Sequence, residues 1–115
     1  LEKLETGSFS NDSSYSRFAY GWKYNKNSGN KPMTFSTTGK GIFMVFKSNQ
    51  NSSLGVLNVT VNGKTASISG NRNYAWGGAD ADIAYIQNET GTLNVSMSMK
   101  DANSDFNIYG IGVVK

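Results

Sequence analysis

Apolar and polar residues alternate along most of this chain, which is the pattern of half-buried β-strands. Successive side chains of a strand point to opposite faces, so every second residue shares a face. The clearest case is residues 93–100, where Leu93, Val95, Met97 and Met99 alternate with polar residues. Residues 42–46 are apolar throughout, which predicts a strand buried on both faces. No stretch repeats every 3.6 residues, so no helix is predicted.

Turn-forming residues separate these strands. Asn62-Gly63, between two alternating runs, predicts a type I′ hairpin, because both central residues of that turn need φ > 0. A one-residue slip in the alternation near Tyr109-Gly110 predicts a bulge in the last strand. The other predicted strands lie near residues 4–9, 18–24, 33–36, 57–61, 64–69, 81–86 and 106–114.

About eight short strands with turns between them predict an all-β fold, specifically a two-sheet antiparallel β-sandwich of the jelly-roll kind. A five-stranded barrel fits less well, because it uses fewer strands. We expect residues 1–14 to be a linker remnant with an edge strand. Residues 15–115 are expected to form a single β-sandwich module, excised from a longer chain.

The segment from residue 72 to 78 places two aromatic residues in a glycine-flanked loop. Loops carry function more often than the strands that they connect. Trp76 and Tyr74 are candidates for stacking on a sugar ring, with Arg72 and Asn73 as partners for its hydroxyl groups. Alternatively, Trp76 closes one end of the sandwich, and Arg72 and Asn73 are solvated loop residues.

An aromatic residue stands at every second position from 18 to 24, namely Phe18, Tyr20, Trp22 and Tyr24. A strand places all four rings on one face. We expect Phe18 and Tyr20 in the core, and Trp22 and Tyr24 toward the loop end as further ligand contacts. If the rings are exposed together, they form a patch that docks on a neighbouring domain or protein.

Composition narrows the chemistry. The sequence has no cysteine and no histidine, which excludes thiol catalysis, Ser-His-Asp catalysis and zinc–thiolate sites. Asp80 and Asp82 fall on one side of an extended segment. They would hold calcium, with Asp12, Asp101 and Asp105 as distant helpers, act as paired catalytic carboxylates, or be solvated. We expect solvation, no catalytic residue and no cofactor, with structural calcium as the alternative.

Charge and hydropathy exclude two further classes. The formal charge of +3 comes from 11 basic and 8 acidic residues scattered along the chain, without the basic groove that nucleic-acid binding needs. No apolar run approaches the roughly 20 residues of a membrane-spanning helix. The polar, uncharged composition, rich in Asn, Ser, Thr and Gly, is typical of secreted proteins that act on polysaccharides.

Several motifs, taken in order, carry a family resemblance. They are Gly39-Lys40-Gly41-Ile42-Phe43, Val59-Thr60-Val61-Asn62-Gly63-Lys64, Ala75-Trp76-Gly77-Gly78 and Phe106-Asn107-Ile108-Tyr109-Gly110-Ile111-Gly112, preceded by Tyr20-Gly21-Trp22. In this order they resemble the accessory domains of secreted carbohydrate-active esterases, which are galactose-binding-like jelly rolls attached to SGNH-type hydrolases. The resemblance implies a sandwich fold, an extracellular setting and a role in carbohydrate attachment. Many related domains hold a structural calcium ion.

Two hypotheses follow. The first is a secreted, monomeric, non-catalytic carbohydrate-binding module that binds plant cell-wall β-glycan and holds a covalently linked enzyme near its substrate. The second is a structural or adhesive β-sandwich that packs against a neighbouring domain or protein through an aromatic stripe. We use this name for Phe18, Tyr20, Trp22 and Tyr24. Neither predicts a nucleic-acid or membrane partner.

Overall fold

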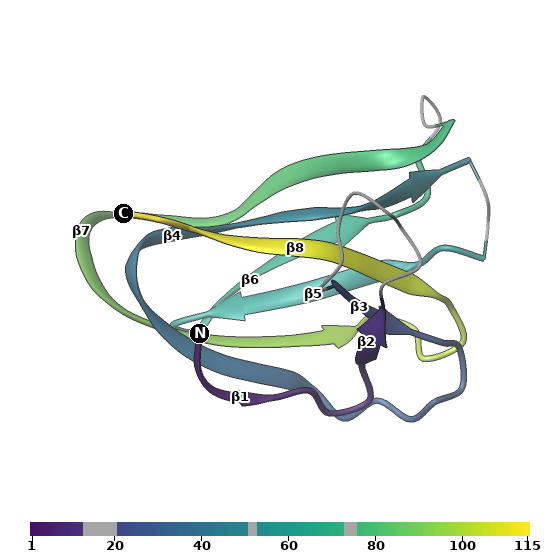
Figure 1. The fold of residues 1–115 in the computed structure, drawn as a ribbon, viewed down its shortest axis with the longest axis horizontal. Coiled ribbons are helices and arrows are strands. Elements are labelled where there is room, and N and C mark those ends of the chain that lie inside the picture. Colours follow the sequence, from purple (N-terminus) through teal and green to yellow (C-terminus); the bar gives the residue numbers. More distant parts are fainter. Residues whose placement is uncertain (13–20, 51–52, 73–75) are drawn as a thin grey trace.

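The computed structural model describes residues 1–12, 21–50, 53–72 and 76–115, with backbone alone at 76 and 77. Every regular element in these ranges is a strand, so the all-β prediction is confirmed. The strands are β1 Glu2–Glu5, β2 Ser10–Asp12, β3 Gly21–Tyr24, β4 Met33–Asn49, β5 Val56–Val61, β6 Lys64–Ser69, β7 Trp76–Met99 and β8 Phe106–Val114 (Figure 1). No helix in these ranges is long and apolar enough to cross a membrane.

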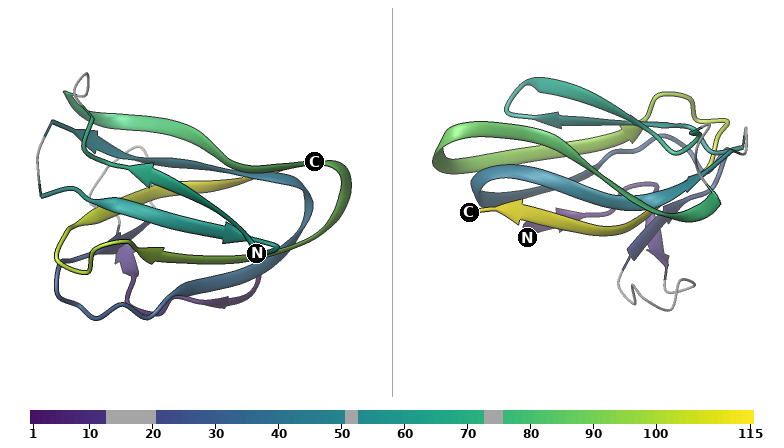
Figure 2. Two further views of the ribbon diagram at one scale, coloured as in Figure 1. Left: turned by 180° about the vertical axis from the view of Figure 1, so that it is seen from behind. Right: turned by 90° about the horizontal axis from the view of Figure 1, so that it is seen from above.

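The strands form one antiparallel sheet that curls into two facing layers (Figures 1 and 2). The first layer contains β1, the first half of β4, the second half of β7, β5 and β6. The second layer contains β2, β3, β8 and the remaining halves of β4 and β7. The sandwich is therefore jelly-roll-like as predicted, but its layers are continuous through two long strands.

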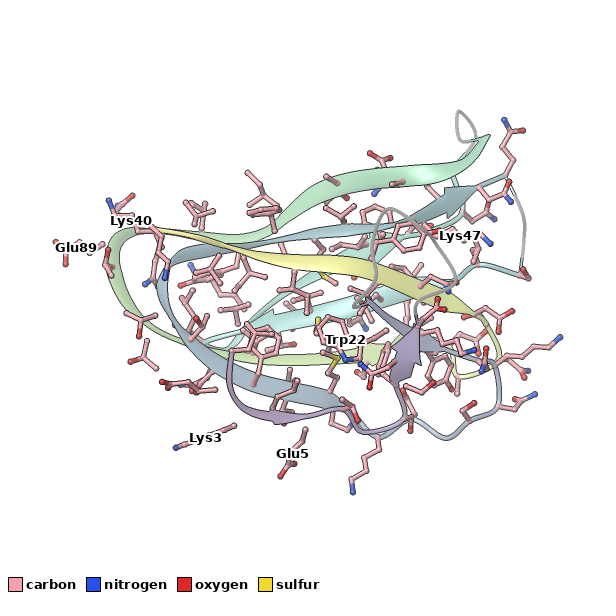
Figure 3. The ribbon with its side chains drawn as sticks, in the orientation of Figure 1. Lys3, Glu5, Trp22, Lys40, Lys47 and Glu89 are labelled. Atoms are coloured by element: carbon pink, nitrogen blue, oxygen red, sulfur yellow. The ribbon has the colours of Figure 1, made fainter. Side chains whose placement is uncertain are left out.

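Both long strands bend at the end where Lys40 and Glu89 lie (Figure 3). Gly39 pairs with Gly91, and Gly41 pairs with Ile86, so β7 takes a wider path around the bend than β4. A Cβ atom at Gly41 would lie 2.5 Å from the backbone oxygen of Tyr85. Only glycine permits that approach of two backbones, which explains why a bend is possible here without breaking the ladder.

The core lies between the layers and follows the predicted alternation. Leu93, Val95, Met97 and Met99 are all buried. The prediction for residues 42–46 was wrong in one respect, because Phe43 is 37 % exposed on the outer face of the second layer. Its ring lies directly over Gly112, where a Cβ would overlap it.

Two local predictions are confirmed. Asn62 and Gly63 have φ values of 49° and 86°, as the hairpin turn requires. The bulge in β8 falls at Tyr109, because Gly110 pairs with Val45 while Ile108 pairs with Phe46.

Residues 1–12 of the N-terminal segment supply strands to the sheet. β1 pairs with β4, and β2 pairs with β3, so the segment supplies two strands instead of one near residues 4–9. Phe9 is buried in the core with its ring centroid 5.5 Å from that of Tyr24. Turn residues such as Gly7, with a φ of 57°, had suggested a linker, but they join the two short strands.

Candidate functional site

The loops gather at the end of the sandwich opposite the bend, which we call the loop end (Figure 1). Its described parts are residues 25–32, 49–50, 53–55, 70–72 and 100–105. Backbone hydrogen bonds link these segments in sequence. Asn27 N–H donates to Ala102 O at 2.8 Å, and Asp105 N–H donates to Ser53 O at 2.7 Å.

The same hydrogen-bonded series continues to the edge of β7. Gly70 N–H donates to Gly55 O at 3.0 Å, and Asn49 N–H donates to Gly70 O at 2.9 Å. Arg72 N–H then donates to Asn49 O at 2.9 Å. The loop end is thus a braced rim, and a braced rim loses less conformational entropy when it binds a ligand than independent loops would.

Exposed amide side chains line this rim. They are Asn25, Asn27, Gln50, Asn71 and Asn103. None of these side chains hydrogen-bonds to the described part of the chain. Each amide offers donors and an acceptor, which is what a neutral hydroxyl-bearing ligand requires. Sequence reasoning treated these residues only as turn formers, although their concentration in four loops was a readable signal.

Tyr24 was predicted to lie toward the loop end as a ligand contact; its hydroxyl does reach loops of that end, but its ring is buried and not available to a ligand. Its side chain is 1 % exposed and belongs to the core. The single hydroxyl proton is shared between Gly29 O at 2.5 Å and Ala102 O at 2.9 Å. Tyr24 therefore braces two loops of the rim from below, and its ring has no open face for a sugar.

The side chain of Arg72 is 17 % exposed, so it is not a solvated loop residue, and its predicted contact with sugar hydroxyls stays a prediction. Its guanidinium lies 4.8 Å from the centroid of the Phe46 ring and pairs with Asp80 at 3.1 Å and with Asp82 at 2.5 Å. Its Nε–H donates to Ser69 O at 2.9 Å. Arg72 thus ties β6 of the first layer to β7 of the second.

Asp80 and Asp82 share a side of β7, as predicted, and the Arg72 guanidinium pairs with both carboxylates on that side. A guanidinium between the two carboxylates supplies the positive charge that calcium would bring, so the pair does not fit a six-to-eight-oxygen calcium site. The proposed helpers lie elsewhere: Asp12 accepts from Asn107 at 2.9 Å, and Asp105 accepts from the backbone of Lys26 at 2.7 Å. Within the described ranges, no three acidic residues cluster as metal ligands.

Trp22 is half-buried and packs against the core from β3 (Figure 3). Its Nε1 is buried and has no hydrogen-bond partner in the part of the chain that the structure describes. The row Trp22–Ile108–Phe46–Asp80 runs across four strands of the second layer, with Arg72 over Phe46. Arg72, Asp80 and Asp82 form what we call the Arg72 cluster. Trp22 on β3 and Asp80 on β7 therefore lie on the inner face of the second layer, with β8 and β4 between them.

The backbone places Trp76 at the rim, where it begins β7 and pairs with Asn49. The side chain of Trp76 lies outside the described residues, as do Asn73 and Tyr74. The predicted core residues Phe18 and Tyr20 also lie outside them. The stacking roles of Trp76 and Tyr74 remain predictions, and the alternative in which Trp76 closes the sandwich remains open.

Comparison with solved structures places this architecture among known proteins. A two-domain esterase active on acetylated mannans, co-crystallised with mannopentaose, matches with a TM-score of 0.76 at 19 % identity over 96 % of this chain and 33 % of that chain. A family 35 carbohydrate-binding module from an environmental isolate matches with a TM-score of 0.69 at 16 % identity over 100 % of this chain and 88 % of that one. The chain shares their fold.

A family two carbohydrate esterase from Clostridium thermocellum, in complex with cellohexaose, has a TM-score of 0.63 at 13 % identity, covering 95 % of this chain and 30 % of that chain. This chain thus spans about a third of the esterases that it resembles, and nearly the whole of the carbohydrate-binding module. No protein-family model matches the sequence, and no curated protein matches it.

Proposed function

We propose that this chain is a non-catalytic carbohydrate-binding module that binds plant cell-wall-type β-glycan at its loop end. The observation that carries the proposal is the full-length match to family 35 carbohydrate-binding modules. This match supports carbohydrate as the ligand class, and it does not single out one carbohydrate. The braced rim with its free amides supports the loop end as the place.

In the proposed mechanism, Trp76 and Tyr74 stack on the face of a pyranose ring, and Asn73 joins the amides of the rim in binding its hydroxyls. Stacking with a few hydrogen bonds on an open surface corresponds to micromolar to millimolar dissociation constants, or about 4–8 kcal/mol. Arg72 contributes indirectly, because it fixes the strand from which the aromatic segment emerges.

The absence of catalysis is part of the proposal. Without histidine, carboxylates are the first candidates for acid–base chemistry, and Asp80 and Asp82 are both engaged by Arg72. Both carboxylates are therefore assigned to a structural ion pair in this proposal.

We further propose that the module belongs to a secreted protein in which a catalytic domain is linked to it. The matching esterases are about three times as long as this chain, which supports a linked enzyme of that general kind. Holding an enzyme on an insoluble polymer raises its effective concentration there, so even millimolar affinity is useful. The docking alternative loses support, because Tyr24 of its aromatic stripe is buried.

Native affinity electrophoresis tests this function. We expect the chain to be retarded in a gel that contains at least one of xyloglucan, mixed-linkage glucan, xylan or mannan, relative to a gel without polysaccharide. Pectin serves as the anionic comparison, and a non-binding protein of similar size corrects for sieving. Equal mobility in every gel would contradict the proposal.

A further inference from the structure

A hollow of about 360 Å³ lies on the outer face of the first layer, away from the loop end. Its polar lining residues are Lys3, Thr34, Ser36, Thr60, Asn94 and Ser96. The volume is at the lower end of the range of about 300–1,000 Å³ for small-molecule sites. The hollow is therefore large enough to receive part of a ligand.

Strand register aligns the polar groups of this hollow. Ser96 of β7 lies opposite Thr34 of β4 on one side and opposite Thr60 of β5 on the other. Asn94 lies opposite Ser36 in the next row. Neighbouring strands are about 4.8 Å apart, so hydroxyl and amide groups repeat at short, regular intervals across the face.

Some polar side chains on this face pair with each other. The hydroxyls of Thr60 and Thr65 are 2.8 Å apart, and Ser67 Oγ donates to Asn58 Oδ1 at 2.7 Å. The side chains of four residues in the hollow differ, because none of them hydrogen-bonds to the described part of the chain. These are Thr34, Ser36, Asn94 and Ser96.

A β-bulge aims Lys3 at the hollow. Glu2 pairs with Ser36 and Glu5 with Thr34, so β1 carries an extra residue over this interval. Lys3 has a φ of 53°, the left-handed conformation that non-glycine residues rarely adopt. Bulges commonly re-aim a side chain, and here Lys3 is one of the residues that line the hollow. Lys3 and Glu5 project from this edge of the sheet (Figure 3).

We propose that this hollow is a second binding site, for a neutral, hydroxyl-rich glycan chain. Apart from Lys3, the polar residues of the lining are neutral, and they favour hydroxyl groups as partners, since Ser, Thr and Asn side chains both donate and accept hydrogen bonds. The two carboxylates of β1 beside one ammonium disfavour an anionic ligand. The site is separate from the loop end, and its existence does not depend on the function proposed there.

The lining has no exposed aromatic ring, because Phe35 is 3 % exposed and packs into the core. Hydrogen bonds to a sugar replace hydrogen bonds to water, so their net gain is small. We therefore expect a dissociation constant of about 1–10 mM. A second weak site increases retention on an insoluble polymer, because both sites engage one particle.

Amide chemical-shift mapping of the 115-residue chain tests the proposal, with cellohexaose, mannohexaose and xylohexaose as probes. We expect at least one probe to shift the amides of residues 34, 36, 94 and 96 in a saturable manner. The double variant Thr34→Val/Ser96→Ala should weaken binding at these amides about fivefold or more. The control Ser67→Ala removes a hydroxyl that pairs with Asn58, outside the lining of the hollow, and should leave the titration unchanged.

The proposal is overturned if none of the three probes shifts these amides at its solubility limit. It is also overturned if the hollow titrates equally well in the Thr34→Val/Ser96→Ala variant. Amides of residues 25–27, 49–50 and 71–72 report on the loop end in the same spectra. The same spectra therefore distinguish a lack of binding at the hollow from a lack of binding at the loop end.

Discussion

Trp76→Ala is expected to abolish measurable retention on polysaccharide while the domain stays folded. Truncating an aromatic anchor at the centre of a binding site costs about 2 kcal/mol or more, which corresponds to roughly a 30-fold loss of affinity. Affinity electrophoresis on the best-bound glycan measures the loss, and circular dichroism with thermal melting measures the fold.

The matched control for Trp76→Ala is Phe43→Ala. Phe43 is 37 % exposed on the outer face of the second layer, away from the loop end, so its loss should leave affinity unchanged. If Trp76→Ala instead yields unfolded protein, the indole belongs to the core, and the alternative in which it closes the sandwich is correct. Retained affinity in folded Trp76→Ala protein would remove Trp76 from the site.

Arg72→Met is expected to destabilise the fold by about 2 kcal/mol, between the values for exposed and buried ion pairs. The Arg72 side chain is 17 % exposed, and those of Asp80 and Asp82 are 28 % and 34 % exposed. Without the guanidinium, two carboxylates face each other at the sandwich edge, and Phe46 loses its cation. Chemical denaturation measures the change, and the melting temperature should fall by about 8 °C.

Two companion variants sharpen this test. Adding Asp80→Asn and Asp82→Asn to Arg72→Met should recover part of the lost stability, because the uncompensated negative charges are then gone. Lys64→Met removes an exposed cation from the β5–β6 hairpin and should change stability by less than about 0.5 kcal/mol. An Arg72→Met protein as stable as the parent would mean that the guanidinium is solvated and does not tie the layers together.

Local patterns predicted most strands, but they could not predict how the strands are shared between layers. The runs 33–36 and 42–46 read as separate strands, yet both belong to β4, and the runs 81–86 and 93–99 both belong to β7. Alternation is a property of neighbouring residues and survives on both sides of a bend. The bend itself depends on backbone approaches such as that of Gly41 to Tyr85 O, which exist only in three dimensions.

Depth within the fold was the second property that the pattern left open. Spacing put Trp22 and Tyr24 on one face, but not at one depth: Tyr24 is fully buried and Trp22 is half-buried. The ion pairs of Arg72 with Asp80 and Asp82 were missed for a related reason. Each of these residues was noted as chemistry-bearing, but the pairs join different segments of the chain, and the pattern within a single strand does not report such contacts.

The most direct test of the central claim uses the two tryptophans of the sequence, Trp22 and Trp76. Trp22→Phe removes the buried Nε1 that lacks a partner among the described residues, so it should fold normally and leave Trp76 as the one tryptophan, which is excited selectively apart from the tyrosines. Its emission should be red-shifted and readily quenched by acrylamide. Adding a glycan that retards the chain should shift the emission to the blue and protect it from quenching. A blue, quencher-resistant emission that no glycan changes would contradict carbohydrate binding through Trp76 at the loop end.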